Sequence, residues 1–153
     1  MVARWVSRSI ALIGLALLSY ALSRPWIVLS TSARWIEYAP LSVLKRMAEG
    51  AGTVPEDLMG LLSEAPEGGK ALAALVAHLA LLAIALILAA LSPIAASGGG
   101  YAATAAFIAL SLAALFVAAE HSAASYSWKA GTLLALAAAF VYLASYAAVR
   151  AFE

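Results

Sequence analysis

The sequence contains no cysteine, asparagine or glutamine. Without cysteine the chain can form no disulfide, thiolate nucleophile or cysteine-ligated metal centre. Without asparagine it has no acceptor for N-glycosylation. Because cysteine and the amide side chains are depleted in hyperthermophile proteins, we expect a hyperthermophilic, archaeal-like source. A GC-rich genome or a designed sequence would give the same bias.

Charge is also scarce. Charged residues make up 11% of the 153-residue chain, against about a quarter in soluble domains. The net charge of +1 predicts no basic surface for nucleic acid. Hydrophobic residues make up 65%, which is typical of a protein embedded in a lipid bilayer. The length suits a single transmembrane domain over residues 1–153.

Long apolar segments predict four membrane helices. Residues 71–119 carry no formal charge, and they are interrupted at Ser92-Pro93 and at Gly98-Gly99-Gly100. About 20 apolar residues cross the hydrocarbon core of a bilayer. The four predicted spans are approximately residues 5–24, 71–92, 101–119 and 130–149. We expect the first span to be a retained helix rather than a signal peptide.

The end of the first span has two interpretations. Pro25 disfavours helical backbone at Arg24, so the helix ends there and reaches back through Trp5. Alternatively, the helix continues through residues 26–29 with a kink at Pro25. Aromatic residues near the predicted helix ends indicate an interfacial belt. They include Trp5, Trp26, Trp35, Tyr101 and Tyr142.

The polar segment of about 30–69 predicts a short amphipathic helical hairpin. Pro40 begins its first helix and Gly50 ends it. Thr53 and Glu56 form a capping box for the second helix. The apolar faces of the hairpin carry Leu41, Leu44, Met47, Leu58, Leu61 and Leu62. This surface either docks a partner or seals one end of the bundle.

Small residues recur at helical spacing, as they do in membrane helices that pack closely. They are Gly14, Ala73, Ala77, Ala105, Ala109, Ala113, Gly131, Ala135 and Ala139. Five hydroxyl side chains are expected to add hydrogen bonds between helices. They are Ser19, Thr104, Ser111, Thr132 and Ser145. The predicted fold class is all-α, a polytopic four-helix transmembrane bundle with the helical hairpin between its first two spans. Some small-residue faces are expected to contact other membrane subunits or further copies of the chain.

Few residues offer chemistry. His78 lies inside the second span, and Glu120 and His121 end the third on the same side of the membrane. An ionisable residue within a membrane is a functional candidate by default, so the three form a candidate polar cluster for proton relay or cation binding. The structural alternative is a hydrogen-bonded histidine and a solvated helix end. No phosphate-binding motif follows the glycines at 98–100, and we expect no metal, cofactor or catalytic residue.

The basic residues that flank the spans predict the orientation of the chain in the membrane. Basic residues flank both sides of the membrane, but Arg4 and Arg8 adjoin the first span. We therefore expect cytoplasmic termini with the hairpin outside.

We expect a non-catalytic accessory, scaffold or assembly subunit of a larger membrane complex. The alternatives are a small transporter or channel component gated near Glu120, His121 and His78, and a lipid enzyme that uses the same residues.

The order of one helix, a long loop that opens with Pro25-Trp26, and three closely spaced helices resembles that of claudin-like and other tetraspan membrane proteins. The resemblance implies a four-span topology. Tryptophans with a cysteine pair mark the claudin loop, and this chain lacks the cysteines. We expect this loop to be helical where the claudin loop is stranded. The resemblance carries over no functional residue.

Overall fold

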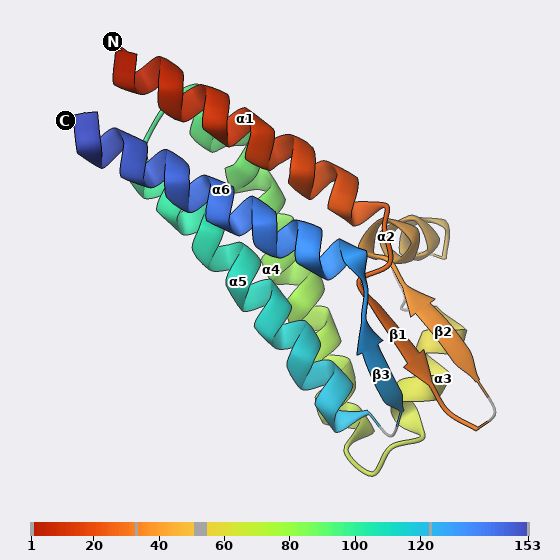
Figure 1. Cartoon of the computed structure of the whole chain (residues 1–153). Helices are drawn as coiled ribbons and strands as arrows, with labels where there is room; N and C mark the ends of the chain where they lie inside the picture. The colour runs from red at the N-terminus through yellow and green to blue at the C-terminus, as the bar shows by residue number, and fades with distance from the viewer. Residues whose placement is uncertain (1, 33, 51–54, 123, 153) are drawn as a thin grey trace.

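Four long helices form the body of the protein. The computed structural model describes residues 2–32, 34–50, 55–122 and 124–152. The long helices are α1 (Val2–Leu22), α4 (Gly68–Ala95), α5 (Gly98–His121) and α6 (Ala130–Phe152). Each is long and apolar enough to cross a membrane. They pack together with both chain ends at one end of the molecule (Figure 1), which confirms the predicted four-helix bundle.

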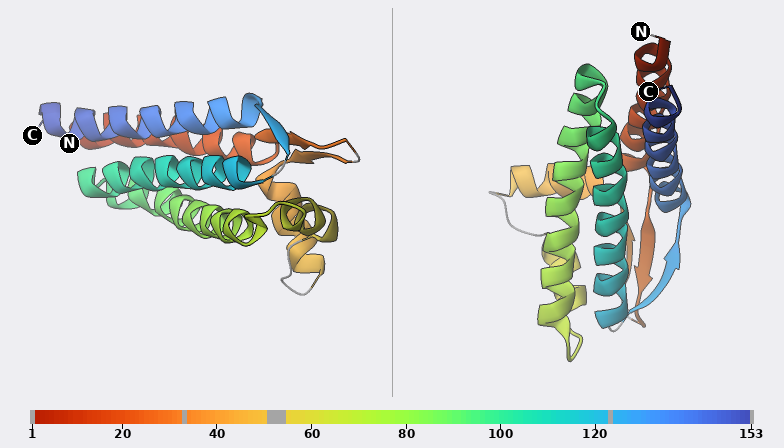
Figure 2. Two further views of the ribbon diagram at one scale, coloured as in Figure 1. Left: turned by 90° about the horizontal axis from the view of Figure 1, so that it is seen from below. Right: turned by 90° about the vertical axis from the view of Figure 1, so that its left-hand side faces the viewer.

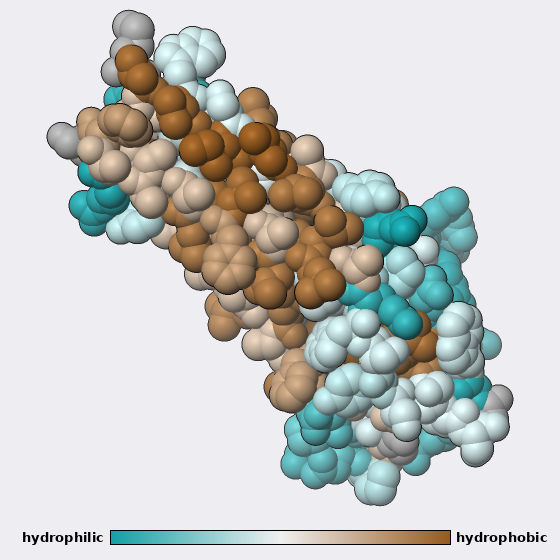
Figure 3. Space-filling view, in the orientation of Figure 1, coloured by the Kyte–Doolittle hydropathy of each residue, from teal (hydrophilic) through white to brown (hydrophobic). Residues whose placement is uncertain are grey.

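The other end of the bundle carries a small sheet and two short helices, which we call the cap. Its strands are β1 (Ile27–Ser30), β2 (Trp35–Tyr38) and β3 (Ser125–Trp128), in the order β2-β1-β3 with both pairs antiparallel. The helices α2 (Pro40–Glu49) and α3 (Glu56–Ser63) lie between β2 and α4 in the chain. On the face that Figure 3 shows, hydrophilic side chains gather over the cap and hydrophobic ones cover the middle of the bundle.

The sheet corrects the predictions for both loops. Residues 27–30 form β1 rather than a kinked continuation of α1, which ends at Leu22. The first loop is therefore partly stranded, and the loop between α5 and α6 supplies β3. Strands of four residues are too short to show an alternating pattern. Moreover, β1 pairs with β3 across 95 residues, as at Ser30 and Ser125, so local sequence gives no sign of the pairing.

The predicted helical hairpin exists, but most of its apolar surface is not open. Leu58, Leu61 and Leu62 of α3 are buried in the core, so they seal the bundle end. Leu44 and Met47 of α2 are partly buried against the same core. Leu41 is 49% exposed and is the member that stays open. The predicted capping-box residue Thr53 lies outside the described residues, and α3 follows Pro55 without a side-chain cap.

The long helices form two layers, α1 with α6 and α4 with α5 (Figure 2). On each helix the buried residues follow alternating steps of three and four, the repeat of helices that cross at a shallow angle. On α4 this row includes Ala71, Leu75, His78, Leu82, Ala85, Ala89 and Ser92. We call the four inward rows the inner face.

The inner face contains only part of the predicted small-residue set. Its buried members are Gly14, Ala105, Gly131, Ala135 and Ala139. Ala73 and Ala77 of α4 and Ala109 and Ala113 of α5 are exposed instead. Residues spaced four apart turn about 40° around the helix axis at each step. A row of such residues therefore runs off a packing face that repeats every seven residues.

Gly14 allows α1 to approach α6 closely. A Cβ atom at this position would come 2.9 Å from Tyr142 Cε2. Tyr142 is wholly buried, and its hydroxyl donates to the carbonyl oxygen of Ala89 at 2.9 Å. The tyrosine therefore fills the space beside Gly14 and also ties α6 to the other helical layer.

Candidate functional site

His78 lies on the inner face of α4 and is wholly buried. Its Nδ1 lies 2.8 Å from both the carbonyl oxygen and the Oγ of Ser111 on α5. Ser111 Oγ also lies 3.2 Å from the His78 carbonyl oxygen. This geometry fits an Nδ1–H that donates to the serine carbonyl and a serine hydroxyl that donates to the histidine carbonyl. The predicted hydrogen bonding of Ser111 between helices is confirmed.

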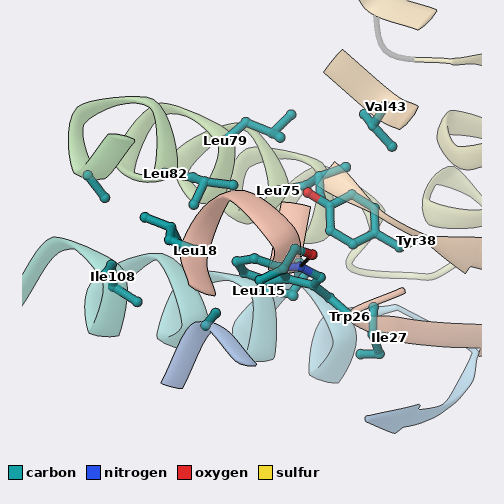
Figure 4. Packing of buried hydrophobic residues seen from close by; sticks show 14 of the residues in the cluster. Leu18, Trp26, Ile27, Tyr38, Val43, Leu75, Leu79, Leu82, Ile108 and Leu115 are labelled. Carbon is teal, nitrogen blue, oxygen red and sulfur yellow. Dashed lines mark hydrogen bonds between the residues drawn. The ribbon is translucent and has the colours of Figure 1, made fainter. Parts of the chain in front are cut away.

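Two aromatic residues at the base of the cap contact the imidazole ring. Trp26 and Tyr38 each place their ring centroid 5.6 Å from it in edge-on contacts, and both lie among the packed core residues of Figure 4. Trp26 Nε1 donates to the Ala21 carbonyl oxygen at 2.7 Å. Thr132 Oγ1 donates to the Trp26 carbonyl oxygen at 2.7 Å, so its partner lies between α1 and β1 and not on another helix, contrary to the prediction. His78 thus contacts the sheet as well as α5.

The sheet packs on parts of α4 and α5 that extend beyond His78. From His78 to Gly68 and from Ser111 to His121 each helix continues for ten residues, about 15 Å at 1.5 Å per residue. Leu75 and Leu115 on these extensions line a small enclosed space with Ile27, Leu29 and Tyr38 of the sheet. The histidine therefore lies below the cap, where the two parts of the molecule meet.

Two polar atoms on neighbouring buried rings are unpaired. Within the described part of the chain, Tyr38 Oη and His78 Nε2 have no hydrogen-bond partner. Burial raises the pKa of the Tyr38 hydroxyl, so this group stays protonated and is a donor. A neutral imidazole with a proton on Nδ1 leaves Nε2 as an acceptor.

Glu120 and His121 end α5 and have other partners. The Tyr126 hydroxyl donates to the Glu120 carboxylate. His121 Nδ1 lies 2.5 Å from Glu67 Oε2, and Lys70 Nζ lies 3.4 Å from the other oxygen of the same carboxylate. The His121 hydrogen bond, followed by the charge of Lys70, lowers the pKa of the Glu67 carboxyl. The contacts of Glu67 therefore join the α3–α4 turn to the end of α5, and the contact of Glu120 joins the end of α5 to β3.

No hydrogen bond, ion pair or ring contact of the described residues joins His78 to Glu120 or His121. Ser111, the partner of His78, lies ten residues before His121 on α5, so the two histidines are separated by about 15 Å along the helix axis. The three candidates therefore occupy two separate environments. Among residues 2–32, 34–50, 55–122 and 124–152, no group of histidine and acidic side chains could hold a metal ion.

An apolar layer lies between His78 and the end of the bundle that holds the termini. Leu18, Leu82 and Ile108 are wholly buried and come from α1, α4 and α5 (Figure 4). Leu82 lies about one helical turn beyond His78, and Ile108 lies three residues from Ser111. Because this layer is close-packed hydrocarbon, it separates the polar atoms around His78 from those at the far end.

A second candidate site, which we did not predict from the sequence, lies on the outside of the cap. A cleft of about 530 Å³ is lined by Arg34, Trp35, Ile36, Glu56 and Asp57, between the outer strand of the sheet and the start of α3. Trp35 is 65% exposed. The sequence signal for this site is the pair Arg34-Trp35, since both residue types are enriched at interaction surfaces, but the interpretation of Trp35 as part of a membrane belt left it unused.

Ion pairs hold the walls of this cleft. Arg34 lies against Gly60, where a side chain would displace it, and its Nη2 is 3.4 Å from Glu64 Oε1. Arg46 of α2 makes two bonds to Asp57, of 2.9 and 3.2 Å. The hydrogen bond from Arg46 lowers the pKa of the Asp57 carboxyl.

The four apolar spans and the sheet that joins both loops define a multi-pass membrane protein with a polar cap on one side. No family model, curated protein or solved structure matches this chain.

Proposed function

We propose that this protein is a non-catalytic accessory, scaffold or assembly subunit of a larger membrane complex. The observation that carries the proposal is the open cleft beside the outer edge of β2, with Trp35 exposed on its wall. Tryptophan and arginine dominate the binding energy of protein interfaces. The cleft combines both with two carboxylates, so it suits a partner segment that carries polar and apolar groups.

The outward alanines of α4 support the same proposal. Ala73, Ala77 and Ala80 are exposed on the outer side of the bundle. Small residues at this spacing let a further transmembrane helix approach closely. In contrast, His78, Glu120 and His121 are engaged in contacts within the chain.

Purification from native membranes in mild detergent tests this function. We expect the protein to elute in a fixed ratio with other membrane proteins, and Trp35→Ala to reduce that ratio. Trp5→Ala is the matched control, because Trp5 is equally exposed but lies at the opposite end. His78→Leu should leave the assembly intact. A chain that elutes alone from native membranes would overturn the proposal.

A transporter or channel component is the second candidate, with a gate near Glu120, His121 and His78. The unpaired Nε2 of His78 favours it, since a buried acceptor is available to a proton or a polar solute. The apolar layer at Leu82 opposes it for a path through one chain. Flux into liposomes that contain only this protein, abolished by His78→Leu, would establish this function instead.

A further inference from the structure

The outward side of the α5–α6 pair is hollowed by an apolar groove of about 270 Å³. Alanines of α5, including Ala106 and Ala109, form one wall. Leu136, Phe140 and Leu143 of α6 form the other. Phe140 is 63% exposed and Leu143 is 44% exposed, so these side chains project beside the groove rather than close it.

The groove points toward a basic residue. Leu136, Leu143 and Arg150 are spaced by seven residues and share one face of α6. The 14 residues from 136 to 150 span about 21 Å along the helix. Half of a bilayer with its headgroups is also about 21 Å thick. The groove residues 136–143 lie around the middle of α6 and Arg150 lies near its end, so the groove and Arg150 together run from the middle of the membrane toward the headgroups of one leaflet.

The guanidinium at the end of this row is positioned by the helix that carries it. Arg150 Nε donates to Tyr146 Oη at 3.2 Å, and the guanidinium lies 5.7 Å from the Tyr146 ring centroid. Beside Tyr146, Gly98 begins α5 and presents no side chain; a Cβ there would be 3.5 Å from Tyr146 Cδ2. A guanidinium has five N–H donors in a fork that matches phosphate oxygens.

We propose that this groove binds one acyl chain of an anionic phospholipid, whose phosphate contacts Arg150. Arg150 is the basic residue that ends this row on α6, so its charge complements an anionic headgroup. Basic sites between transmembrane helices recognise anionic lipids in this way. This lipid site is independent of the partner proposed for the cap.

Native mass spectrometry of the detergent-solubilised full chain tests the headgroup contact. The probes are phosphatidylglycerol and phosphatidylcholine with identical acyl chains. We expect the wild-type chain to retain phosphatidylglycerol more strongly. Arg150→Gln should weaken this retention about fivefold, as expected for one basic residue at an anionic lipid surface, and leave phosphatidylcholine unchanged. Arg4→Gln, an exposed residue on α1 at the same end, should change neither.

The second arm tests the groove. Ala109→Phe should fill it and reduce retention of both lipids, whereas Ala77→Phe on the outer side of α4 should not. Equal retention of phosphatidylglycerol by the wild type and Arg150→Gln would overturn the proposal, and this comparison decides it even if Ala109→Phe fails to fold. Full competition by inorganic phosphate would indicate a phosphate site without the acyl chain. Dissociation of a dimer by Ala109→Phe at constant lipid retention would make the groove an interface between copies.

Discussion

Buried hydroxyl and imidazole groups of this protein lie on the inner face, where some bond their own helix and others bond the next one. Ser145 Oγ donates to the Val141 carbonyl of its own helix and Thr104 Oγ1 to the Gly100 carbonyl of its own, so these two bonds are not the predicted bonds between helices. His78 and Ser111 bond across the α4–α5 pair. The cross-helix bonds are the ones that fix helix position, because they are lost when the helices separate.

Ser111→Ala removes one of these bonds while His78 keeps its contact with the backbone carbonyl at position 111. We expect the free energy of unfolding to fall by about 0.6 kcal/mol, the average for a hydrogen bond between membrane helices. Thermal unfolding in detergent measures the change. Ser19→Ala is the control, because Ser19 is exposed on α1. An equal loss in both variants would contradict a special role for the His78–Ser111 pair.

Gly14→Val tests the close approach of α1 and α6. Its Cβ would lie 2.9 Å from Tyr142 Cε2, so either the ring or the helix must move. We expect a loss of about 1–3 kcal/mol in the free energy of unfolding, as for other overpacked cores. Ala16→Val adds a similar side chain at an exposed position of the same helix and should be tolerated. Equal stability of the two variants would show that the pair can separate without cost.

The sites were less predictable than the spans. Long runs of apolar residues identify each membrane helix, since a segment can cross when it is apolar over about 20 residues. The aromatic partners of His78 could not be predicted from the sequence. Trp26 and Tyr38 belong to segments whose position depends on the sheet. The inner face could have been predicted from the spacing of the polar residues within the spans, which repeats every seven residues. Thr104 and Ser111 are seven apart on α5, and His78 and Ser92 are fourteen apart on α4.

Among the secondary-structure elements, α2 and α3 are joined by the ion pair of Arg46 and Asp57. Because the folded-state pKa of Asp57 is lowered, the pair contributes stability above the unfolded pKa of about 3.9. That contribution is lost as the pH falls through the lower folded-state value. We expect the stability advantage of the wild type over Asp57→Asn to disappear as the pH falls below about 4.

The effect should be small, within about 1 kcal/mol, because both side chains are about half exposed. Unfolding of the two proteins followed across the pH range measures it, and added salt should reduce the difference. A constant difference at every pH would rule out the carboxylate charge as its source.

For the molecule as a whole, four crossings place both termini on one side and the cap on the other. We predict that the termini are cytoplasmic and the cap is outside. Because the chain has no cysteine, Lys45→Cys provides a single exposed thiol on α2. An impermeant thiol reagent should label it in intact cells, while reporter fusions at either terminus should both report the cytoplasm. Labelling only after lysis would reverse the orientation.

Composition makes a second prediction for the whole chain. If the absence of cysteine, asparagine and glutamine reflects a hyperthermophilic source, the purified protein should unfold above about 90 °C. Thermal unfolding in detergent measures the melting temperature. A value in the range of mesophile domains would instead favour a GC-rich genome or a designed sequence as the origin of the bias.

The shared sheet also has a consequence for biosynthesis. β1 leaves the ribosome 95 residues before the strand that completes its second edge. At about 5–20 residues per second, that edge waits roughly 5–20 s while α4 and α5 are synthesised. A nascent chain that stalls before β3 therefore displays an unsatisfied β-strand, and this exposed backbone distinguishes unfinished molecules from finished ones.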